Sequence, residues 1–459
     1  MVDKRGANMS IGTVQDLAGA LRDGRRDPVD LVAEVFDRID RHNDPALFIR
    51  SLRPRAEAEA RAARERLRAG NPASLVDGVP LAWKDLFDLK GSVTTAGSIV
   101  LRDAAPATAD AALVNAALRA GMVSVGAVNM TEFAYSGIGL NPHYGTPRNP
   151  CDPKIARAPG GSSSGCGAVV AAGIVPVAIG TDTGGSVRIP ASFNGVVGFK
   201  TSTGHYPMKG VFPLARTLDT LGPLAQSVAD CVLTDAALRG LAAPTVVAAP
   251  LDALDLVIPD RFMFDDLATA VASNFDAAVG RLTKAGVRVR AIALPELHEV
   301  SALMGRYGPF TSAEAMDVHK ERLAGPEVTR IDPRVVRRIR MADAMSAVDL
   351  IRLTEGRLEW IARLNARLGN AILIAPTTPS VAMPIASLEA DVEVFFHHNA
   401  RTLRNTAIGN FLDWCGMSIP NGTDSDGMPT GFMMCAQHGQ DRAMLAAGLA
   451  IEPLVRGES

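Results

Sequence analysis

The chain has 459 residues, of which 47 are lysine or arginine and 49 are aspartate or glutamate, so its formal charge is −2. Because the two signs are interspersed and no basic stripe is present, the composition argues against a nucleic-acid-binding surface. No apolar run approaches the ~20 residues of a membrane-spanning helix, so no membrane partner is expected. Five scattered cysteines indicate neither a disulfide framework nor a zinc site. No secretory leader is recognisable, and the cytoplasm is the predicted location.

Strand and helix patterns alternate along the chain. Pro54–Ala69 is an Ala/Arg/Glu helix, with proline in its first turn and Gly70 just past its end. A second helix is predicted over 111–120, with Asp110 as its cap, and Val123–Val128 follows as a buried strand. Later strands are predicted at 174–179, 256–258, 287–292, 371–375 and 431–436, and later helices at 166–173, 267–285 and 443–454. No linker or repeat divides the chain, so this alternation predicts an α/β sandwich around one sheet.

The segment from Gly137 to Ser164 is rich in glycine, proline, asparagine and serine and follows no helix or strand period. Long irregular segments inside a compact domain are usually functional. Its end contains a G-x-S-x-G pattern centred on Ser163. A nucleophile elbow needs a strand directly before it, but Asn149–Pro159 has three prolines and no strand pattern. The sequence therefore disfavours an α/β-hydrolase esterase that uses Ser163.

A glycine-rich turn follows the strand predicted at 174–179 and carries Thr183, Gly184, Gly185 and Ser186. Two glycines before a serine let the backbone approach a ligand closely, and successive amide N–H groups form a concavity that suits an anion. An acyl-transfer enzyme needs such donors beside its nucleophile, where each is worth roughly 10²–10³ in rate. Taken alone, this short motif is more often a structural turn.

Lys84 closes a short apolar strand that begins near Gly78. A lysine accepts a proton only when it is neutral, so its pKa would have to fall from the ordinary ~10.4, and burial between apolar walls has that effect. Taken alone, Lys84 is equally compatible with an ion pair to Asp85.

Together, these three segments resemble the amidase signature family of serine amidohydrolases, which use a Ser–cis-Ser–Lys triad. The family's G-G-S-S-x-G element is similar to Gly160–Gly165, and its G-T-D-T-G-G-S-[IV]-R element is similar to Gly180–Arg188. Ser162 and Ser186 are 24 positions apart, as in the family, and the family's lysine falls on Lys84.

The resemblance is strong over 76–230, moderate over 372–454 and loose between 241 and 370. It implies a single large α/β domain, residues 1–459, with a central mixed β-sheet covered by helices on both faces. We divide this domain into four parts. Residues 1–70 are an N-terminal helical region and residues 76–230 a catalytic core. Residues 241–370 are a variable substrate-pocket region, and residues 371–459 return to the sheet.

The resemblance also implies roles for these residues. Ser186 is expected to be the nucleophile, Ser162 to follow a cis Gly161–Ser162 peptide and pass the proton, and Lys84 to receive it. Ser163 is expected to support the lysine end of this relay by hydrogen bonding. The oxyanion is expected to be bound by the backbone amides of Ser186 and of the residues before it, Thr183, Gly184 and Gly185.

Asp182 and Arg188 flank the nucleophile and are expected to form a structural ion pair, with contact between Arg188 and an anionic substrate as the alternative. A rival histidine base has candidates in His205, His298 and the pair 397–398, but none lies in a recognisable context. No histidine has the H-E-x-x-H spacing of a metal site, so neither a metal nor a cofactor is expected.

The identity of the substrate stays open, and Phe395, Phe396 and Trp414 are candidate apolar walls of its pocket. The leading hypothesis is a stand-alone amidohydrolase that cleaves a small carboxamide to an acid and ammonia or an amine. One alternative is the A-type glutaminase subunit of a glutamine-dependent tRNA amidotransferase, which would work in a complex. Others are a hydrolase of urea-type amides such as carboxylated biurets, or of acyl hydrazides. A homodimer is common in the family, and a non-catalytic scaffold is disfavoured because every triad position carries the required side chain.

Overall fold

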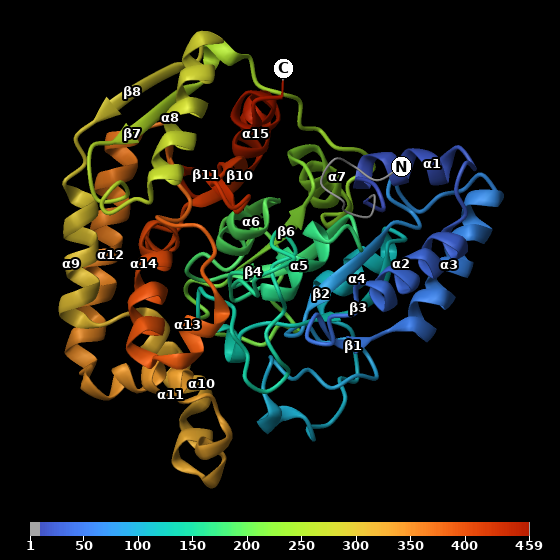
Figure 1. Ribbon diagram of the computed structural model, residues 1–459, viewed down its shortest axis with the longest axis horizontal. Coiled ribbons are helices and arrows are strands. Elements are labelled where there is room, and N and C mark those ends of the chain that lie inside the picture. The colour runs from blue at the N-terminus through green and yellow to red at the C-terminus, as the bar shows by residue number, and fades with distance from the viewer. Residues whose placement is uncertain (1–9, 459) are drawn as a thin grey trace.

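The computed structural model describes residues 10–458 and contains one eleven-stranded sheet at its centre (Figure 1). Its strands are β1 (Phe48–Ser51), β2 (Pro80–Lys84), β3 (Val123–Val128), β4 (Val177–Asp182), β5 (Val197–Lys200), β6 (Thr220–Ala225), β7 (Asp255–Pro259), β8 (Arg288–Ile292), β9 (Ile372–Pro376), β10 (Cys415–Thr423) and β11 (Pro429–Ala436). They lie in the order β1-β3-β2-β4-β6-β5-β10-β11-β9-β7-β8.

The sheet is mixed, as predicted. The neighbours β3, β2 and β4 are parallel, and so are β9, β7 and β8, whereas every other neighbouring pair is antiparallel. The two parallel groups need long crossover connections, which are built from helices. The chain therefore forms one α/β domain around a single sheet.

The α-helices lie between and around the strands. They are α1 (Val14–Arg22), α2 (Pro28–His42), α3 (Arg53–Arg68), α4 (Ala112–Arg119), α5 (Ser164–Ala171), α6 (Arg188–Asn194), α7 (Val228–Leu238), α8 (Thr269–Lys284), α9 (Glu296–Tyr307), α10 (Phe310–Ala324), α11 (Pro333–Ile339), α12 (Ala347–Leu368), α13 (Ile385–Ala390), α14 (Val392–Phe411) and α15 (Asp441–Arg456).

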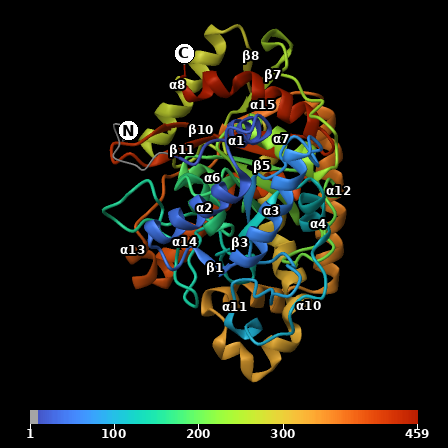
Figure 2. The ribbon, with the colours of Figure 1, turned by 90° about the vertical axis from the view of Figure 1, so that its right-hand side faces the viewer.

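Helices cover both faces of the sheet (Figure 2). On one face α15 packs on β10, where Gly448 approaches Met417. On the other face α6 approaches β5 so closely that a Cβ on Gly198 would lie 2.6 Å from the Cβ of Ala191. Because α6 begins two residues after Ser186, this close packing seats the predicted nucleophile directly against the sheet.

The strand β4 runs from Val177 to Asp182, whereas the sequence predicted 174–179. The strand extends further because β6 pairs with it as far as Asp182↔Thr220. Thr181 and Asp182 are therefore strand residues, and the glycine-rich turn begins at the strand's end.

Asp110 does not cap α4, which corrects the prediction. Ala111 occupies the N-cap position without a side-chain cap. The carboxylate of Asp110 instead accepts hydrogen bonds from Arg55, at 2.7 Å, and from the backbone N–H of Lys90, at 2.8 Å. A charged guanidinium is a stronger partner for a carboxylate than a helix N–H, and it draws the side chain away.

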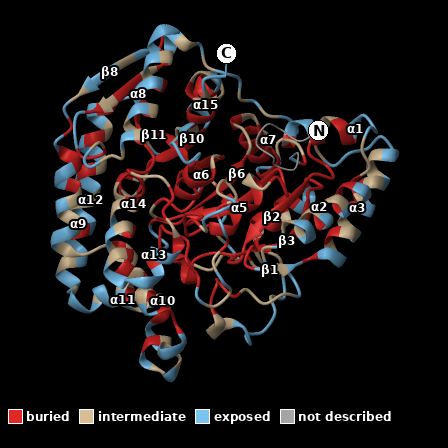
Figure 3. Ribbon diagram, in the orientation of Figure 1, coloured by how far each residue is buried: buried red, intermediate tan, exposed pale blue. Residues whose placement is uncertain are grey.

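The central strands are buried, and exposed residues lie on the outer helices (Figure 3). Residues 241–370 add β7 and β8 at one edge of the sheet, and α9 and α12 run side by side along the margin of the molecule (Figure 1). No helix within residues 10–458 is both long enough and apolar enough to cross a membrane.

Candidate active site

Lys84 lies at the end of β2 with a fully buried side chain. Its Nζ donates a hydrogen bond to Ser162 Oγ at 2.7 Å and another to Thr181 Oγ1 at 2.7 Å. Burial lowers the pKa of Lys84 to about 7, and the nearby carboxylates of Asp182 and Asp219 only partly oppose this effect. The amine can therefore exchange a proton near neutral pH.

Ser162 follows a cis peptide bond to Gly161, as the resemblance to the family implied. The N–H of Gly161 donates to the carbonyl of Gly137 at 2.8 Å, and the carbonyl of Ser162 accepts from Thr131 N–H at 3.0 Å. Gly137 in the irregular segment and Thr131 just before that segment thus hold Ser162 from both sides, with its hydroxyl facing Lys84.

Ser186 lies in the turn between β4 and α6, and 4% of its surface is exposed. Gly185 before it has a φ of +133°, and a Cβ there would lie 2.2 Å from Thr406 Oγ1. Glycine is therefore required at 185 both for the backbone conformation and for the space. Gly184 is less confined, because a Cβ there would meet nothing closer than Leu403 Cδ2, at 3.5 Å.

The carboxylate of Asp182 organises this turn. It accepts the backbone N–H of Gly185 at 2.8 Å and that of Val187 at 3.1 Å. The amide of Gly185 is thus already occupied, which corrects its prediction as an oxyanion donor. Among residues 10–458, the amides of Thr183, Gly184 and Ser186 have no acceptor, so these three remain as candidates.

The predicted ion pair between Asp182 and Arg188 is confirmed. Arg188 Nη2 lies 3.0 Å from Asp182 Oδ1, and both side chains are fully buried. Burial alone would raise the pKa of Asp182, but the guanidinium of Arg188 outweighs it and holds that pKa below its ordinary value. Arg188 also donates to Asn410 Oδ1 at 2.6 Å. With its surface covered, Arg188 is unsuited to the alternative role of meeting an anionic substrate.

One face of α14 lies along the site, and the sequence analysis missed it. Asn399 Oδ1 accepts the N–H of Gly137 at 2.9 Å, and Leu403 packs on Gly137. Thr406 Oγ1 donates to the carbonyl of Gly184 at 2.6 Å, and Asn410 Nδ2 donates to Asp182 Oδ1 at 2.9 Å. The positions 399, 403, 406 and 410 follow a helical spacing, and three of them are polar, which is the signal that could have revealed this face.

One supporting contact differs in detail from its prediction, and another was not predicted. Ser163 Oγ donates to the carbonyl of Thr181 at 3.3 Å, so its hydrogen bonding reaches the lysine only through that residue. Thr183 Oγ1 donates to Asp219 Oδ1 at 2.6 Å, and burial raises the pKa of Asp219 to about 6. Thr181 and Asp219 were not predicted, since neither belongs to a catalytic motif read from the chain.

The predicted pocket walls are mostly covered. Trp414 is 1% exposed, and its indole N–H donates to Asn365 on α12 at 3.0 Å, so it is a core residue and offers no surface to a substrate. Phe395 is also buried, and Arg334 lies over its ring at 4.9 Å. Phe396 is half-buried. The apolar side chains that reach the catalytic turns include Leu403 and Ile189.

The histidines lie in other networks. His205 Nε2 pairs with Asp235 at 2.7 Å, and His298 with Asp265 at 3.6 Å. The rings of His397 and His398 pack against each other. Among residues 10–458, no group of histidine, cysteine or acidic side chains could hold a metal ion.

A family model described as Amidase matches residues 30–445. The chain belongs to the amidase family. This amidase is 35% identical over 409 residues to 2-amino-5-chloromuconic acid deaminase of Comamonas testosteroni, a match that covers 87% of each chain. It is 33% identical over 479 residues to the A-type subunit of glutamyl-tRNA(Gln) amidotransferase from Methylococcus capsulatus, with 95% of each chain covered.

Among solved structures, an amidase matches with a TM-score of 0.86 and 30% identity, covering 95% of this chain and 98% of that one. Family and relatives agree that this amidase is a hydrolase of carbon–nitrogen bonds other than peptide bonds.

Proposed function

We propose that the protein hydrolyses a small carboxamide to a carboxylic acid and ammonia through an acyl-enzyme on Ser186. The observation that carries this proposal is the buried Lys84 amine, with a pKa of about 7 and 2.7 Å from Ser162 Oγ. A general base works best when its pKa lies near the working pH. Lys84 is therefore the group that can activate the two serines.

In this mechanism Ser186 Oγ attacks the amide carbonyl while its proton passes to Ser162, whose own proton passes to Lys84. The oxygen of the tetrahedral intermediate is bound by the free amides at 183, 184 and 186. The carbon–nitrogen bond then breaks as Lys84 returns the proton through Ser162 to the leaving nitrogen. Water attacks the acyl-enzyme by the same relay, which releases the acid and restores Ser186.

We further propose that the substrate carries a carboxylate, because an arginine without an acidic partner lies beside the site. The guanidinium of Arg338 lies 4.5 Å over the ring of Tyr135. Its Nε is buried, and within residues 10–458 the guanidinium has neither a hydrogen-bond acceptor nor an ion pair. Tyr135 lies two residues before Gly137, whose carbonyl accepts the N–H of Gly161.

Arg338 differs from the neighbouring arginines of α11, because each of those has an acidic partner. Arg334 pairs with Asp332 at 2.7 Å, and Arg337 pairs with Glu393 at 2.5 Å. A relative named for an acid, 2-amino-5-chloromuconic acid deaminase, agrees with an anionic substrate. A charge-assisted hydrogen bond to such a carboxylate is worth roughly 1.5–3 kcal/mol.

The A-type subunit of a tRNA amidotransferase stays the second candidate, because a relative of that name matches along 95% of the chain. That role would make glutamine the amide donor and would require partner chains. Urea-type amides and acyl hydrazides need the same acyl chemistry, so they belong to the same test. We propose a cytoplasmic location, because thiols stay reduced there and Cys166, Cys231, Cys415 and Cys435 are buried and free.

The test is ammonia release from a panel of amides, with hydrazine release measured for a hydrazide. The panel contains carboxylated amides such as succinamic acid, their neutral analogues, glutamine and a urea-type amide. We expect turnover of a carboxylated amide that disappears in Ser186→Ala. Activity that survives in that variant would disprove the nucleophile, and turnover of glutamine alone would favour the amidotransferase role.

The carboxylate contact has its own matched pair of variants. Arg338→Met is expected to raise KM for the carboxylated amide about 10–100-fold, in line with one charge-assisted hydrogen bond. Arg337→Met removes a neighbouring arginine that already has Glu393 as its partner, and it should leave KM unchanged. Equal effects of the two variants would contradict the proposed role of Arg338.

A further inference from the structure

Helix α12 carries an apolar row on its solvent side. Val348, Ile351 and Leu358 are 62%, 56% and 60% exposed. Within residues 10–458, five of the nine large hydrophobic side chains that are exposed lie between Met341 and Leu358. Single exposed apolar residues are normal, but a cluster of this kind marks an interaction surface.

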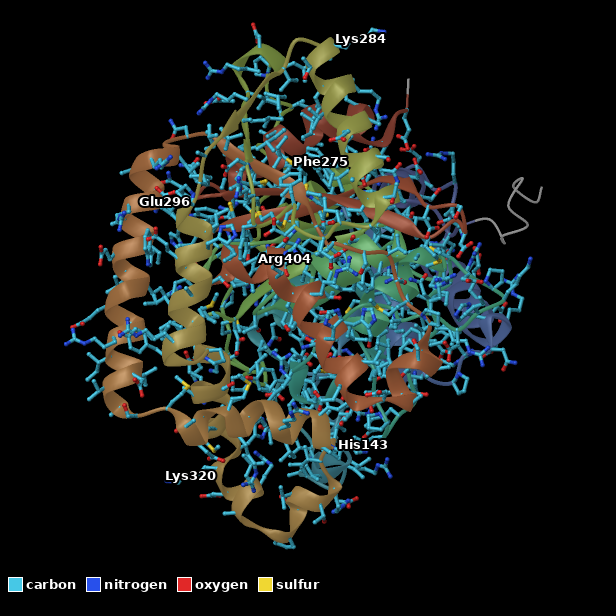
Figure 4. The ribbon with its side chains drawn as sticks, turned by 60° about the vertical axis from the view of Figure 1, so that its left-hand side comes forward. His143, Phe275, Lys284, Glu296, Lys320 and Arg404 are labelled. Atoms are coloured by element: carbon cyan, nitrogen blue, oxygen red, sulfur yellow. The ribbon has the colours of Figure 1, made fainter. Side chains whose placement is uncertain are left out.

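The opposite face of α12 already has its partners in the same chain. Leu353, Trp360 and Leu364 are buried. Arg367 pairs with Glu296, the first residue of α9, which is labelled by its residue name in Figure 4. The exposed row therefore has no part in the packing of α12 against its own chain.

The spacing of the row matches the seam of a two-helix pair. Positions 348, 351, 355, 358 and 362 advance in alternating steps of three and four, which is the heptad pattern of helices that pack along one line. Glu355 stands at the centre of this row, and its carboxylate accepts from Arg352 on the same helix at 3.0 Å. The row is thus apolar at both ends with one neutralised charge in the middle.

The row is also self-complementary about Glu355. Val348 and Ala362 lie seven positions before and after it, and Ile351 and Leu358 lie four before and three after. Arg352 lies three positions before Glu355, and Glu359 lies four after it. An antiparallel copy therefore brings apolar residues together and places each Arg352 near the partner's Glu359. The two Glu355 carboxylates also meet at the axis, where each is neutralised by Arg352 of its own helix, whereas a parallel copy would oppose like charges at 352, 355 and 359 alike.

We propose that α12 is a homodimer interface, in which the helices of two copies pack antiparallel around a two-fold axis near Glu355. A helix of 22 residues is about 33 Å long, so one helix pair buries less than a standard interface. The dimer is accordingly concentration-dependent. This inference concerns a surface of the fold and does not depend on the proposed function.

The first test is the crosslinking of single cysteines in the full-length protein. Glu355→Cys places two thiols beside the axis and should form an intermolecular disulfide under mild oxidation. Ala366→Cys is exposed on the same helix, but the antiparallel arrangement separates its two copies by about 33 Å along the axis. It should not crosslink, and neither should the parent protein. Crosslinking at 366 as efficient as at 355, or none at 355, would overturn the proposal.

The second test is a charge exchange followed by light scattering. The mass should rise from 48.2 kDa toward twice that value as the concentration increases. Glu359→Arg should raise the dissociation constant at least tenfold, and adding Arg352→Glu should restore the dimer. Both side chains are exposed on the surface, so unchanged thermal melting will show that the fold is intact. A protein that stays at 48.2 kDa throughout, or a dimer indifferent to Glu359→Arg, would disprove this interface.

Discussion

Lys84 Nζ lies 2.7 Å from Thr181 Oγ1, the same distance as from Ser162 Oγ. The amine is therefore held between two hydroxyl groups, one on the predicted proton relay and one on the neighbouring strand β4. This arrangement fixes where the lysine points, and among residues 10–458 no carboxylate lies within ion-pair distance of its amine. The first predictions follow from that environment.

The activity should depend on pH through Lys84. Only the neutral amine accepts a proton, so with a pKa of about 7 the rate should fall tenfold per pH unit below about 7 and level off above it. The measurement is kcat/KM between pH 5 and 9, with thermal melting as the control for folding. Lys84→Arg, which stays charged throughout, should be inactive. A flat profile across pH 7 would contradict Lys84 as the base.

The same burial should make Lys84 costly for stability. Because its pKa is lower in the folded chain than in the unfolded one, the unfolded state binds more protons between pH 7 and 10.5. Stability from this group therefore rises with pH across that window and is lowest at and below pH 7. Lys84→Met should melt at a higher temperature than the parent protein near pH 7, with the difference shrinking toward pH 10. Melting curves at several pH values will measure it.

Thr181→Val should weaken catalysis without removing a triad residue. It deletes the second acceptor of the lysine, which destabilises the ammonium form, so the pKa of Lys84 should fall and the acid limb should move to lower pH. A lost hydrogen bond of about 1–3 kcal/mol corresponds to roughly a 5–150-fold fall in rate. Thr181→Ser should restore the profile, and a Thr181→Val enzyme with the parent profile would disprove the role.

The adjacent glycines 184 and 185 should differ sharply in how well they tolerate a side chain. A Cβ at 185 would lie 2.2 Å from Thr406 Oγ1 on a backbone with a φ of +133°, whereas one at 184 has a nearest neighbour at 3.5 Å. Gly185→Ala should therefore distort the turn and lower kcat by at least a hundredfold. Gly184→Ala should keep its turn and most of its activity. The comparison of the two kcat values is the measurement, and equal losses would contradict it.

Asp182→Asn should destabilise the fold as a whole. It leaves the fully buried Arg188 without a compensating charge, and breaking a buried ion pair typically costs about 3–5 kcal/mol. Urea denaturation will measure the free energy of unfolding. Asn410→Ala keeps the ion pair and should cost less, about 1–3 kcal/mol. A fully stable Asp182→Asn protein would show that this pair is not structural.

The sequence predicted the residues that motifs mark and missed those that only folding brings together. Lys84, Ser162 and Ser186 were found because their spacing matches a family pattern, and the cis peptide came with it. Gly185 was misassigned as an oxyanion donor because a glycine in a turn does not reveal that Asp182 already accepts its N–H. Trp414 was misplaced because aromatic character alone does not separate a pocket wall from a core residue. The face of α14 was missed because its contacts join positions more than 200 residues apart.

The dependence of the nucleophile turn on α14 also concerns how the protein is made. All three proposed catalytic side chains lie before residue 190, yet Thr406 and Asn410 hold the turn that carries Ser186. A ribosome releases the N-terminal part first, with its serines and lysine in place but without the helix that orients them. A nascent chain, or a fragment cut before residue 392, therefore holds the reactive groups without their geometry. The enzyme becomes competent only when nearly the whole chain has been synthesised.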